Sequence, residues 1–168
     1  DNYFEQLSNV VYIVVSDQDI ITSVNYRMNN PDVDYSIELY NQRKVEAKIK
    51  QFDVLENVKN AIIVGPSGEY LYYYGASLVQ GYAFDEQPWF MEATDTNRMR
   101  FVNYHPTDYL LNGSEKQTVS LVVPILNASQ YFLAETAYLL CDFSLEPILV
   151  DPGRDGEVQI AVYNGKDP

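Results

Sequence analysis

The spacing of apolar residues changes once along the chain, near Asn60, and this change limits the fold to few architectures. Before it, apolar residues recur every three or four positions, as on one face of a helix: Phe4, Leu7, Val11, Val14, Ile21 and Met28. After it, short apolar or aromatic runs alternate with turn residues, as in strands. Helices followed by an antiparallel sheet predict an α+β domain, because a doubly wound nucleotide-binding fold would alternate the two.

The first thirty residues are predicted to form one long helix with an imperfect apolar stripe, since polar Gln18 and Asn25 occupy two of its positions. The β-branched cluster at 10–15 favours a strand more weakly, because a strand would leave the flanking periodicity unexplained. The run Asn29-Asn-Pro-Asp32 breaks the helix. A second helical stretch is indicated by residues at helical spacing: Val45, Ile49, Phe52 and Leu55.

Strands are predicted from the alternation of apolar runs and turns. Residues 61–64 and 69–74 flank the turn Gly65-Pro-Ser-Gly68 and form a hairpin pattern. Further strands are expected at 100–104, 117–126 and 131–142, with Gly- and Asn-containing turns before and between the last two. Asp142 and Ser144 then suit the start of a short helix limited by Pro147.

Charge and residue counts exclude several classes of function. A formal net charge of −13 would repel a nucleic-acid backbone or an anionic membrane surface, so no nucleic-acid partner is predicted. One histidine and one cysteine cannot build a multi-histidine metal site or an internal disulfide, and no metal or other cofactor is predicted. No apolar run reaches the roughly 18 residues of a membrane span.

No pattern of a catalytic site is found. The sequence lacks a phosphate-binding glycine loop and a Walker lysine. The segment Gly65-Pro-Ser-Gly68 does not have the five-residue spacing of a nucleophile elbow and is typical of a turn. Neighbouring acids such as Asp85 and Glu86 are expected on a surface with 24 acidic residues. The chain is therefore predicted not to be an enzyme.

Residues 82–93, between the first hairpin and the later strands, form the least ordinary stretch. They contain the single tryptophan, Trp89, directly after Pro88. Proline suits the first turn of a helix, which would fix Trp89 and Phe90 beside the sheet. Aromatic rings with nearby polar groups line many small-molecule pockets. Composition alone favours a core role for Trp89.

This stretch carries a resemblance. The pattern Tyr82-x4-Gln-Pro-Trp-Phe-x2-Ala93, followed by a strand pair and by Asp142-Phe-Ser-Leu145, resembles the Cache family of extracytoplasmic sensor domains over about 150 residues. The resemblance implies a PAS-like fold, a non-catalytic sensor domain of a bacterial membrane receptor, and a small-molecule ligand. A histidine kinase is the expected output; a chemoreceptor or a diguanylate cyclase would carry a similar sensor.

The family's amino-acid-binding branch surrounds its ligand with a Tyr, an Arg, a Trp-Tyr pair and a later Asp. This sequence retains Tyr82, Trp89 and Asp142, but Gln87 stands in the Arg position and Phe90 in that of the second Tyr. Neutral Gln87 cannot replace the bidentate grip of Arg on a carboxylate, so an α-amino acid ligand is not implied. Packing explains Tyr82 and Phe90 equally well, and helix capping explains Asp142. Further residues expected to line the cavity are Tyr104, His105 and Tyr109.

The resulting expectation is a helical region at 1–59, a PAS-like Cache module at 60–150, and a final strand or truncated second module at 151–168. The chain is expected to be a fragment of a membrane-anchored receptor and to form a homodimer through its N-terminal helix. Ligand binding would then shift a two-state equilibrium of these helices. Three alternatives are an envelope interaction module without a ligand cavity, a small hydrolase using His105, and an intracellular PAS-type regulator.

Overall fold

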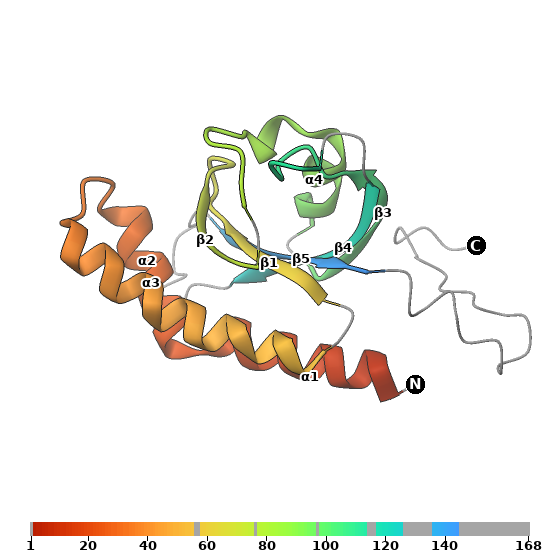
Figure 1. The fold of residues 1–168 in the computed structure, drawn as a ribbon, viewed down its shortest axis with the longest axis horizontal. Coiled ribbons are helices and arrows are strands. Elements are labelled where there is room, and N and C mark those ends of the chain that lie inside the picture. Colours follow the sequence, from red (N-terminus) through yellow and green to blue (C-terminus); the bar gives the residue numbers. More distant parts are fainter. Residues whose placement is uncertain are drawn as a thin grey trace, which may run out of the picture.

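The computed structural model describes residues 2–55, 58–75, 77–96, 98–113, 117–125 and 136–144. Helices cover one face of a five-stranded antiparallel sheet, and a short helical segment covers the other face (Figure 1). The predicted α+β fold with a PAS-like antiparallel sheet is confirmed. The final strand or truncated second module predicted at 151–168 lies outside the described residues.

The N-terminal helical region contains three helices, α1 (Asn2–Ser16), α2 (Gln18–Asn29) and α3 (Tyr35–Ile49), and the last continues into the 3-10 helix η1 (Lys50–Val54). The single long helix predicted for the first thirty residues is interrupted at Asp17. The carboxylate of Asp17 accepts hydrogen bonds from the backbone nitrogens of Asp19 (2.9 Å) and Ile20 (3.2 Å), so it caps α2.

This interruption explains why the apolar stripe is imperfect. Gln18, which occupies a stripe position in one continuous helix, lies exposed in the first turn of α2. The core-facing positions of α2 are instead occupied by Ile20, Ile21 and Val24. The apolar face therefore restarts at the cap, and the two polar positions are not gaps in a single stripe.

The sheet contains β1 (Val58–Val64), β2 (Tyr70–Tyr74), β3 (Arg100–Pro106), β4 (Gln117–Ile125) and β5 (Ala137–Phe143) in the order β2-β1-β5-β4-β3. All neighbouring pairs are antiparallel. The predicted turn closes the β1–β2 hairpin, with Gly65 nitrogen donating to Glu69 oxygen at 2.7 Å. The helix start predicted at Asp142 is wrong, because Asp142 lies within β5.

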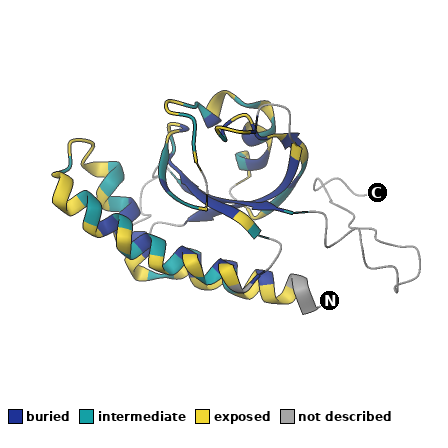
Figure 2. Cartoon of the chain, in the orientation of Figure 1, coloured by how far each residue is buried: buried dark blue, intermediate teal, exposed yellow. Residues whose placement is uncertain are grey.

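Each strand of the centre of the sheet is buried on both faces, which is why β5 shows no polar alternation (Figure 2). On the helix side, alternate strand residues such as Ile63, Leu121 and Leu139 pack with the apolar faces of α1, α2 and α3. On the other side, residues such as Ile62, Val122 and Leu140 pack beneath the short segment that contains α4 (Pro88–Thr94). The protein therefore has two cores separated by the sheet.

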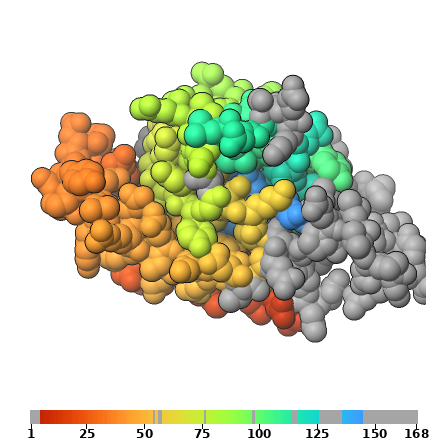
Figure 3. All heavy atoms as spheres, viewed as in Figure 1, coloured from red at the N-terminus to blue at the C-terminus, as the bar shows by residue number. Residues whose placement is uncertain are grey.

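The surface of the molecule shows the same two layers, one on each face of the sheet. In the space-filling view the orange N-terminal helices occupy one side of the molecule, and the yellow-green to teal residues that follow β2 gather over the opposite side (Figure 3). Within the described residues, no helix is long and apolar enough to cross a membrane.

Candidate ligand-binding site

Residues 82–94, here called the roof segment, lie over the sheet face opposite the three helices (Figure 1). They form the 3-10 helix η2 (Phe84–Glu86) and the helix α4, with Pro88 at its first position as predicted. The Phe84 nitrogen donates to the Gly68 carbonyl at 3.1 Å, which attaches the segment to the β1–β2 turn. Local helix geometry and this hairpin contact therefore position Trp89 and Phe90.

Aromatic rings fill the space between the roof segment and the sheet. Phe84 is fully buried, and its ring centroid lies 5.5 Å from Phe90 and 5.2 Å from Tyr109. Trp89 stacks on His105, with 3.8 Å between ring centroids and 18° between planes. The ring of Tyr82 contacts Phe84 edge-on at 4.8 Å. These six side chains, here called the roof cluster, are Tyr82, Phe84, Trp89, Phe90, His105 and Tyr109.

His105 reaches the roof cluster because β3 contains a bulge. Val102 pairs with Ser120 and His105 pairs with Thr118, so two residues of β3 lie opposite one residue of β4. With regular alternation, Val102 and Tyr104 would share a face and His105 would point to the helices. The extra residue instead buries His105 to 1% exposure and leaves Tyr104 60% exposed.

Below the roof cluster, polar side chains form a row across four strands. Asp142 of β5 pairs with Asn60 of β1 on one side and with Ser120 of β4 on the other. The Ser120 hydroxyl contacts the Asp142 carboxylate and lies 2.7 Å from His105 Nε2. Tyr109 donates to the second carboxylate oxygen at 2.6 Å. All five residues are buried, so this row, here called the polar row, is Asn60, Asp142, Ser120, His105 and Tyr109.

The hydrogen bonds of the polar row require one more proton than is present when His105 is neutral and Asp142 is ionised. His105 Nδ1 lies 2.9 Å from the Pro106 carbonyl, an acceptor only, so Nδ1 carries a proton. In a neutral ring Nε2 is then an acceptor, and the single hydroxyl proton of Ser120 faces both Nε2 and the Asp142 carboxylate. Both contacts are hydrogen bonds only when Asp142 or Nε2 is also protonated.

Burial determines whether that proton lies on Asp142 or on His105. Desolvation raises the pKa of Asp142 to about 6, against the lowering effect of the hydrogen bonds from Ser120, Tyr109 and Asn60. Desolvation also lowers the pKa of His105 to about 4, with the Pro106 hydrogen bond opposing it. Between about pH 6 and pH 4 the proton therefore resides on Asp142, and His105 stays neutral.

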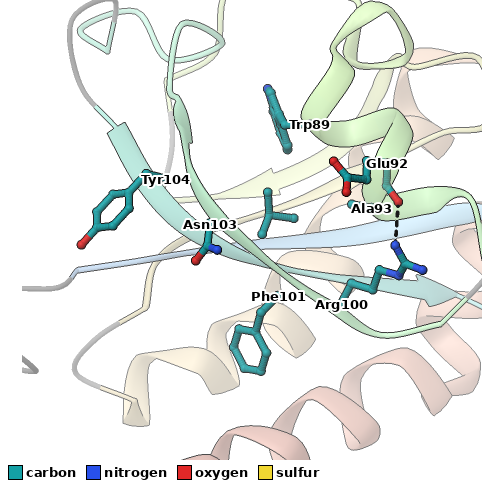
Figure 4. Close-up of a pocket in the computed structure, with 8 residues that line it drawn as sticks. Trp89, Glu92, Ala93, Arg100, Phe101, Asn103 and Tyr104 are labelled. Atoms are coloured by element: carbon teal, nitrogen blue, oxygen red, sulfur yellow. Dashed lines mark hydrogen bonds between the residues drawn. The ribbon is translucent and has the colours of Figure 1, made fainter. Parts of the chain in front are cut away.

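Several cavities border the roof cluster and the polar row, and two of them are lined by Trp89 and by Asn60, respectively. The first, of about 200 Å³, lies between α4 and β3 and is called the Trp89 cavity (Figure 4). In the close-up, Phe101 points away from the roof segment towards the helices, while the Arg100 guanidinium donates to the Glu92 carbonyl at 3.0 Å. Arg100 also pairs with Asp95 at 3.2 Å. The second, of about 470 Å³, borders Asn60 and Asp142 and is called the Asn60 cavity.

The structure brings most of the predicted site residues together. Six of the eight lie in the roof cluster or the polar row: Trp89, Tyr82, Asp142, Phe90, His105 and Tyr109. Tyr104 lines the Trp89 cavity from its exposed position. Gln87 lies apart, because its amide nitrogen turns back to the Ala83 carbonyl at 3.3 Å.

Sequence reasoning missed the residues that complete the polar row, Ser120 and Asn60, and the central ring, Phe84. One signal was available for Ser120, which interrupts an otherwise apolar run, because a polar side chain in a strand buried on both faces requires a partner. Asn60 follows Lys59 at the start of an apolar run and gives no such signal.

The site does not have the geometry of a hydrolase. Ser120 and His105 are in contact, but the serine is completely buried and its hydroxyl is also engaged by Asp142. A nucleophile needs an accessible oxygen and a base that is oriented by a third group, whereas here the serine stands between the other two. Among the described residues, no group of three or more His, Cys, Asp or Glu side chains could hold a metal ion.

Comparison with known proteins finds similarity in structure and none in sequence. Neither a family model nor a curated protein matches the sequence. A domain of a sensory box/GGDEF family protein from Vibrio parahaemolyticus superposes with a TM-score of 0.58 at 11% identity, covering 84% of this chain and 53% of that one. The extracellular domain named histidine kinase vpHK1S-Z8 gives 0.58 at 10% identity, covering 88% and 52%.

The ligand-binding domain of the Pseudomonas fluorescens chemoreceptor CtaA, in complex with L-serine, gives a TM-score of 0.52 at 12% identity and covers 87% of this chain and 54% of that one. This chain thus spans about half the length of the structures that it resembles. At these identities the likeness concerns the fold. The chain has the PAS-like fold of bacterial sensor and ligand-binding domains, as its resemblance to the Cache family predicts.

Proposed function

We propose that this chain is the extracytoplasmic ligand-sensing domain of a bacterial transmembrane receptor and that its small-molecule ligand binds beside Trp89. The supporting observation is the Trp89 cavity, which lies between a roof helix and the sheet in a fold that ligand-binding sensor domains share. Aromatic, apolar and charged groups border it together: Trp89, Ala93, Arg100 and Glu92. This mixture is typical of small-molecule sites.

The ligand is not expected to be gripped as in the family's amino-acid-binding branch. Gln87 has no charge and turns towards its own backbone, so it cannot replace the family's arginine. Arg100 supplies a guanidinium at the cavity, but its donors already engage Glu92 and Asp95. A ligand would therefore compete for Arg100, and shape and ring contacts with Trp89 would contribute much of the affinity.

Signal transfer is proposed to pass from α4 through β3 and the sheet to the N-terminal helices. Helix α4 contacts β3 and β4, and α1 contacts β4 from the opposite face. A ligand that binds one arrangement of α4 more tightly would shift the equilibrium of the helices by its difference in affinity. A histidine kinase output is favoured by the resemblance, with a chemoreceptor or a diguanylate cyclase as the alternatives.

Dimerisation through α1 is part of the proposal. Two large apolar residues of this helix, Tyr12 and Ile13, are 71% and 51% exposed. A second copy would cover them. The double substitution of both by Lys is expected to convert a dimer into a monomer in sedimentation velocity, and a monomeric wild type would contradict this part.

The ligand proposal is tested by a thermal-shift screen of small metabolites on the purified domain. A compound that binds only the folded state raises the Tm. We expect Trp89→Ala to weaken the binding of such a compound by at least about tenfold, as for a central aromatic contact. Met91→Ala is the matched control, because Met91 lies on the same helix and is 55% exposed. Unchanged affinity in a folded Trp89→Ala protein would contradict the proposal.

A further inference from the structure

The Asn60 cavity borders the polar row at Asn60 and Asp142 and has a larger volume than the Trp89 cavity. Its volume of about 470 Å³ lies within the range of roughly 300 to 1,000 Å³ that is typical of small-molecule sites. It lies between the ends of β1, β4 and β5 and the loop at 107–113. The polar residues that border it include Lys59, Asn60, Ser77, Thr107, Thr118 and Asp142.

The loop wall of this cavity is closed by its own hydrogen bonds. The Thr107 hydroxyl donates to the Gly113 carbonyl at 3.0 Å, and the Gly113 nitrogen donates to the Leu110 carbonyl at 3.0 Å. The Leu111 nitrogen donates to the Ser77 carbonyl at 2.9 Å, which joins the loop to the segment after β2. The wall is therefore formed before any ligand binds, which lowers the entropic cost of binding.

One buried acceptor at this cavity has no donor. The side chain of Asn60 is 6% exposed, and its amide forms a hydrogen bond with the Asp142 carboxylate. Since a carboxylate accepts, the amide nitrogen faces Asp142, and this fixes the orientation of the amide. Asn60 Oδ1 then has no hydrogen-bond partner in the part of the chain that the structure describes. A buried acceptor without a donor is costly, so a ligand hydroxyl or N–H would gain from binding there.

The charges at the cavity select against a cationic ligand. Asp142 already receives hydrogen bonds from Ser120, Tyr109 and Asn60, so its carboxylate is occupied. Lys59 borders the cavity and its charge acts to lower the pKa of Asp142, but no described carboxylate lies within ion-pair distance of its ammonium group. An anionic group of a ligand would find a partner in Lys59, whereas an ammonium group would have to displace the partners of Asp142.

We infer that the Asn60 cavity binds a small hydroxylated carboxylate, with a hydroxyl donating to Asn60 Oδ1 and the carboxylate pairing with Lys59. The inference deepens the proposed sensing function and rests on it for any signal, but the binding itself does not require the Trp89 cavity. A carboxylate without a hydroxyl leaves the Asn60 acceptor unpaired, and a hydroxylated neutral molecule leaves Lys59 unpaired. The cavity therefore distinguishes these three kinds of molecule.

The test uses D-gluconate, D-glucose and hexanoate as probes in calorimetric titration and thermal shift of the whole domain. Gluconate carries both groups, glucose only hydroxyls and hexanoate only the carboxylate. We expect gluconate to bind at least about tenfold more tightly than either of the others, since each missing contact costs about that factor. Equal binding of hexanoate and gluconate, or no binding of gluconate at about 10 mM, would overturn the inference.

Variants locate the binding. Lys59→Ala is expected to weaken gluconate at least about fivefold and to leave glucose unchanged, because it removes the charge-assisted contact alone. Lys50→Ala, which removes another exposed lysine from η1, is the matched control. Asn60→Leu is expected to abolish the preference for gluconate over hexanoate. If that variant does not fold, the Lys59 and Lys50 comparison still decides, because equal effects of the two would overturn the inference.

Trp89→Ala separates this inference from the proposed function. Gluconate binding that persists in Trp89→Ala and is lost in Lys59→Ala supports the Asn60 cavity, whatever the metabolite screen finds beside Trp89. Gluconate binding that requires Trp89 and not Lys59 would assign the ligand to the Trp89 cavity and overturn the inference. A screen without ligands for Trp89, together with Lys59-dependent gluconate binding, would contradict only the proposed site beside Trp89.

Discussion

Replacing Asp142 by Asn is expected to make the domain lose stability as the pH falls from about 6.5 to 4, where the wild type changes little. In the folded wild type, the pKa of Asp142 is raised to about 6 from its ordinary value of 3.8. The folded state therefore binds this proton more tightly than the unfolded state. The stability that Asp142 contributes by binding this proton is fully present below about pH 3.8 and is lost as the pH rises through 6.

His105 acts in the opposite direction in the same window. Burial lowers its pKa from 6.5 to about 4, so its contribution to stability is full above pH 6.5 and is lost as the pH falls through 4. With about 1.4 kcal/mol for each pKa unit, either group changes the free energy of unfolding by about 3 kcal/mol. The two changes cancel in the wild type, and Asp142→Asn leaves the loss from His105 alone.

Urea unfolding followed by far-UV circular dichroism between pH 7 and pH 4, at constant ionic strength, measures this directly. Asp142→Asn should lose about 3 kcal/mol on acidification relative to the wild type. His105→Phe, which keeps an aromatic ring beside Trp89, should gain a similar amount because only Asp142 still titrates. If both variants follow the wild-type profile, the opposite pKa shifts assigned to Asp142 and His105 are refuted.

Two further predictions concern the scaffold. Asp17→Ala should lower the free energy of unfolding by about 1 kcal/mol, chiefly through loss of the α2 cap, because its surface ion pair with Lys48 at 3.0 Å contributes little. Asp19→Ala removes surface ion pairs with Lys44 at 3.4 Å and Lys48 at 3.9 Å but no cap, so it should lower the free energy less. Equal losses in urea titrations would contradict the capping role. Gly68→Ala should cost more than Gly81→Ala. Both glycines have a positive φ, and an alanine in that conformation costs about 1–2 kcal/mol at either position. A Cβ on Gly68 would also lie 2.6 Å from the Asp85 nitrogen, whereas a Cβ on Gly81 would meet no atom within 4 Å. A similar loss of Tm in both variants would show that the Asp85 contact relaxes without cost.

The secondary structure could be predicted from sequence wherever one periodicity dominates. The hairpin around Gly65 and Gly68 and the first turn of α4 at Pro88 follow from local chemistry alone. The break between α1 and α2 was missed because the apolar residues on either side of Asp17 also fit one helix. A carboxylate that caps the following turn interrupts such a helix without a proline or a glycine, so periodicity cannot detect it.

The positions of the candidate site could be named from the sequence, but their chemical environment could not. A resemblance transfers positions one by one, and two positions that it named, Trp89 and Asp142, lie on one face of the sheet. It does not say which neighbouring side chains form hydrogen bonds with the residues at those positions. Here Ser120 and Asn60 engage the Asp142 carboxylate, so a group that could otherwise receive a ligand's ammonium is already satisfied within the protein.

The bulge in β3 decides which chemistry the site contains. Without the extra residue after Val102, Tyr104 would face the roof segment and His105 would face the apolar core on the helix side. With it, His105 stacks on Trp89 and closes the polar row at Ser120. If ligand binding moves α4 as proposed, the displacement of Trp89 would change the burial of His105 and, through Ser120, the protonation of Asp142. A ligand beside Trp89 would thus alter proton binding at Asp142, and proton release measured during ligand titration near pH 6 reports that coupling.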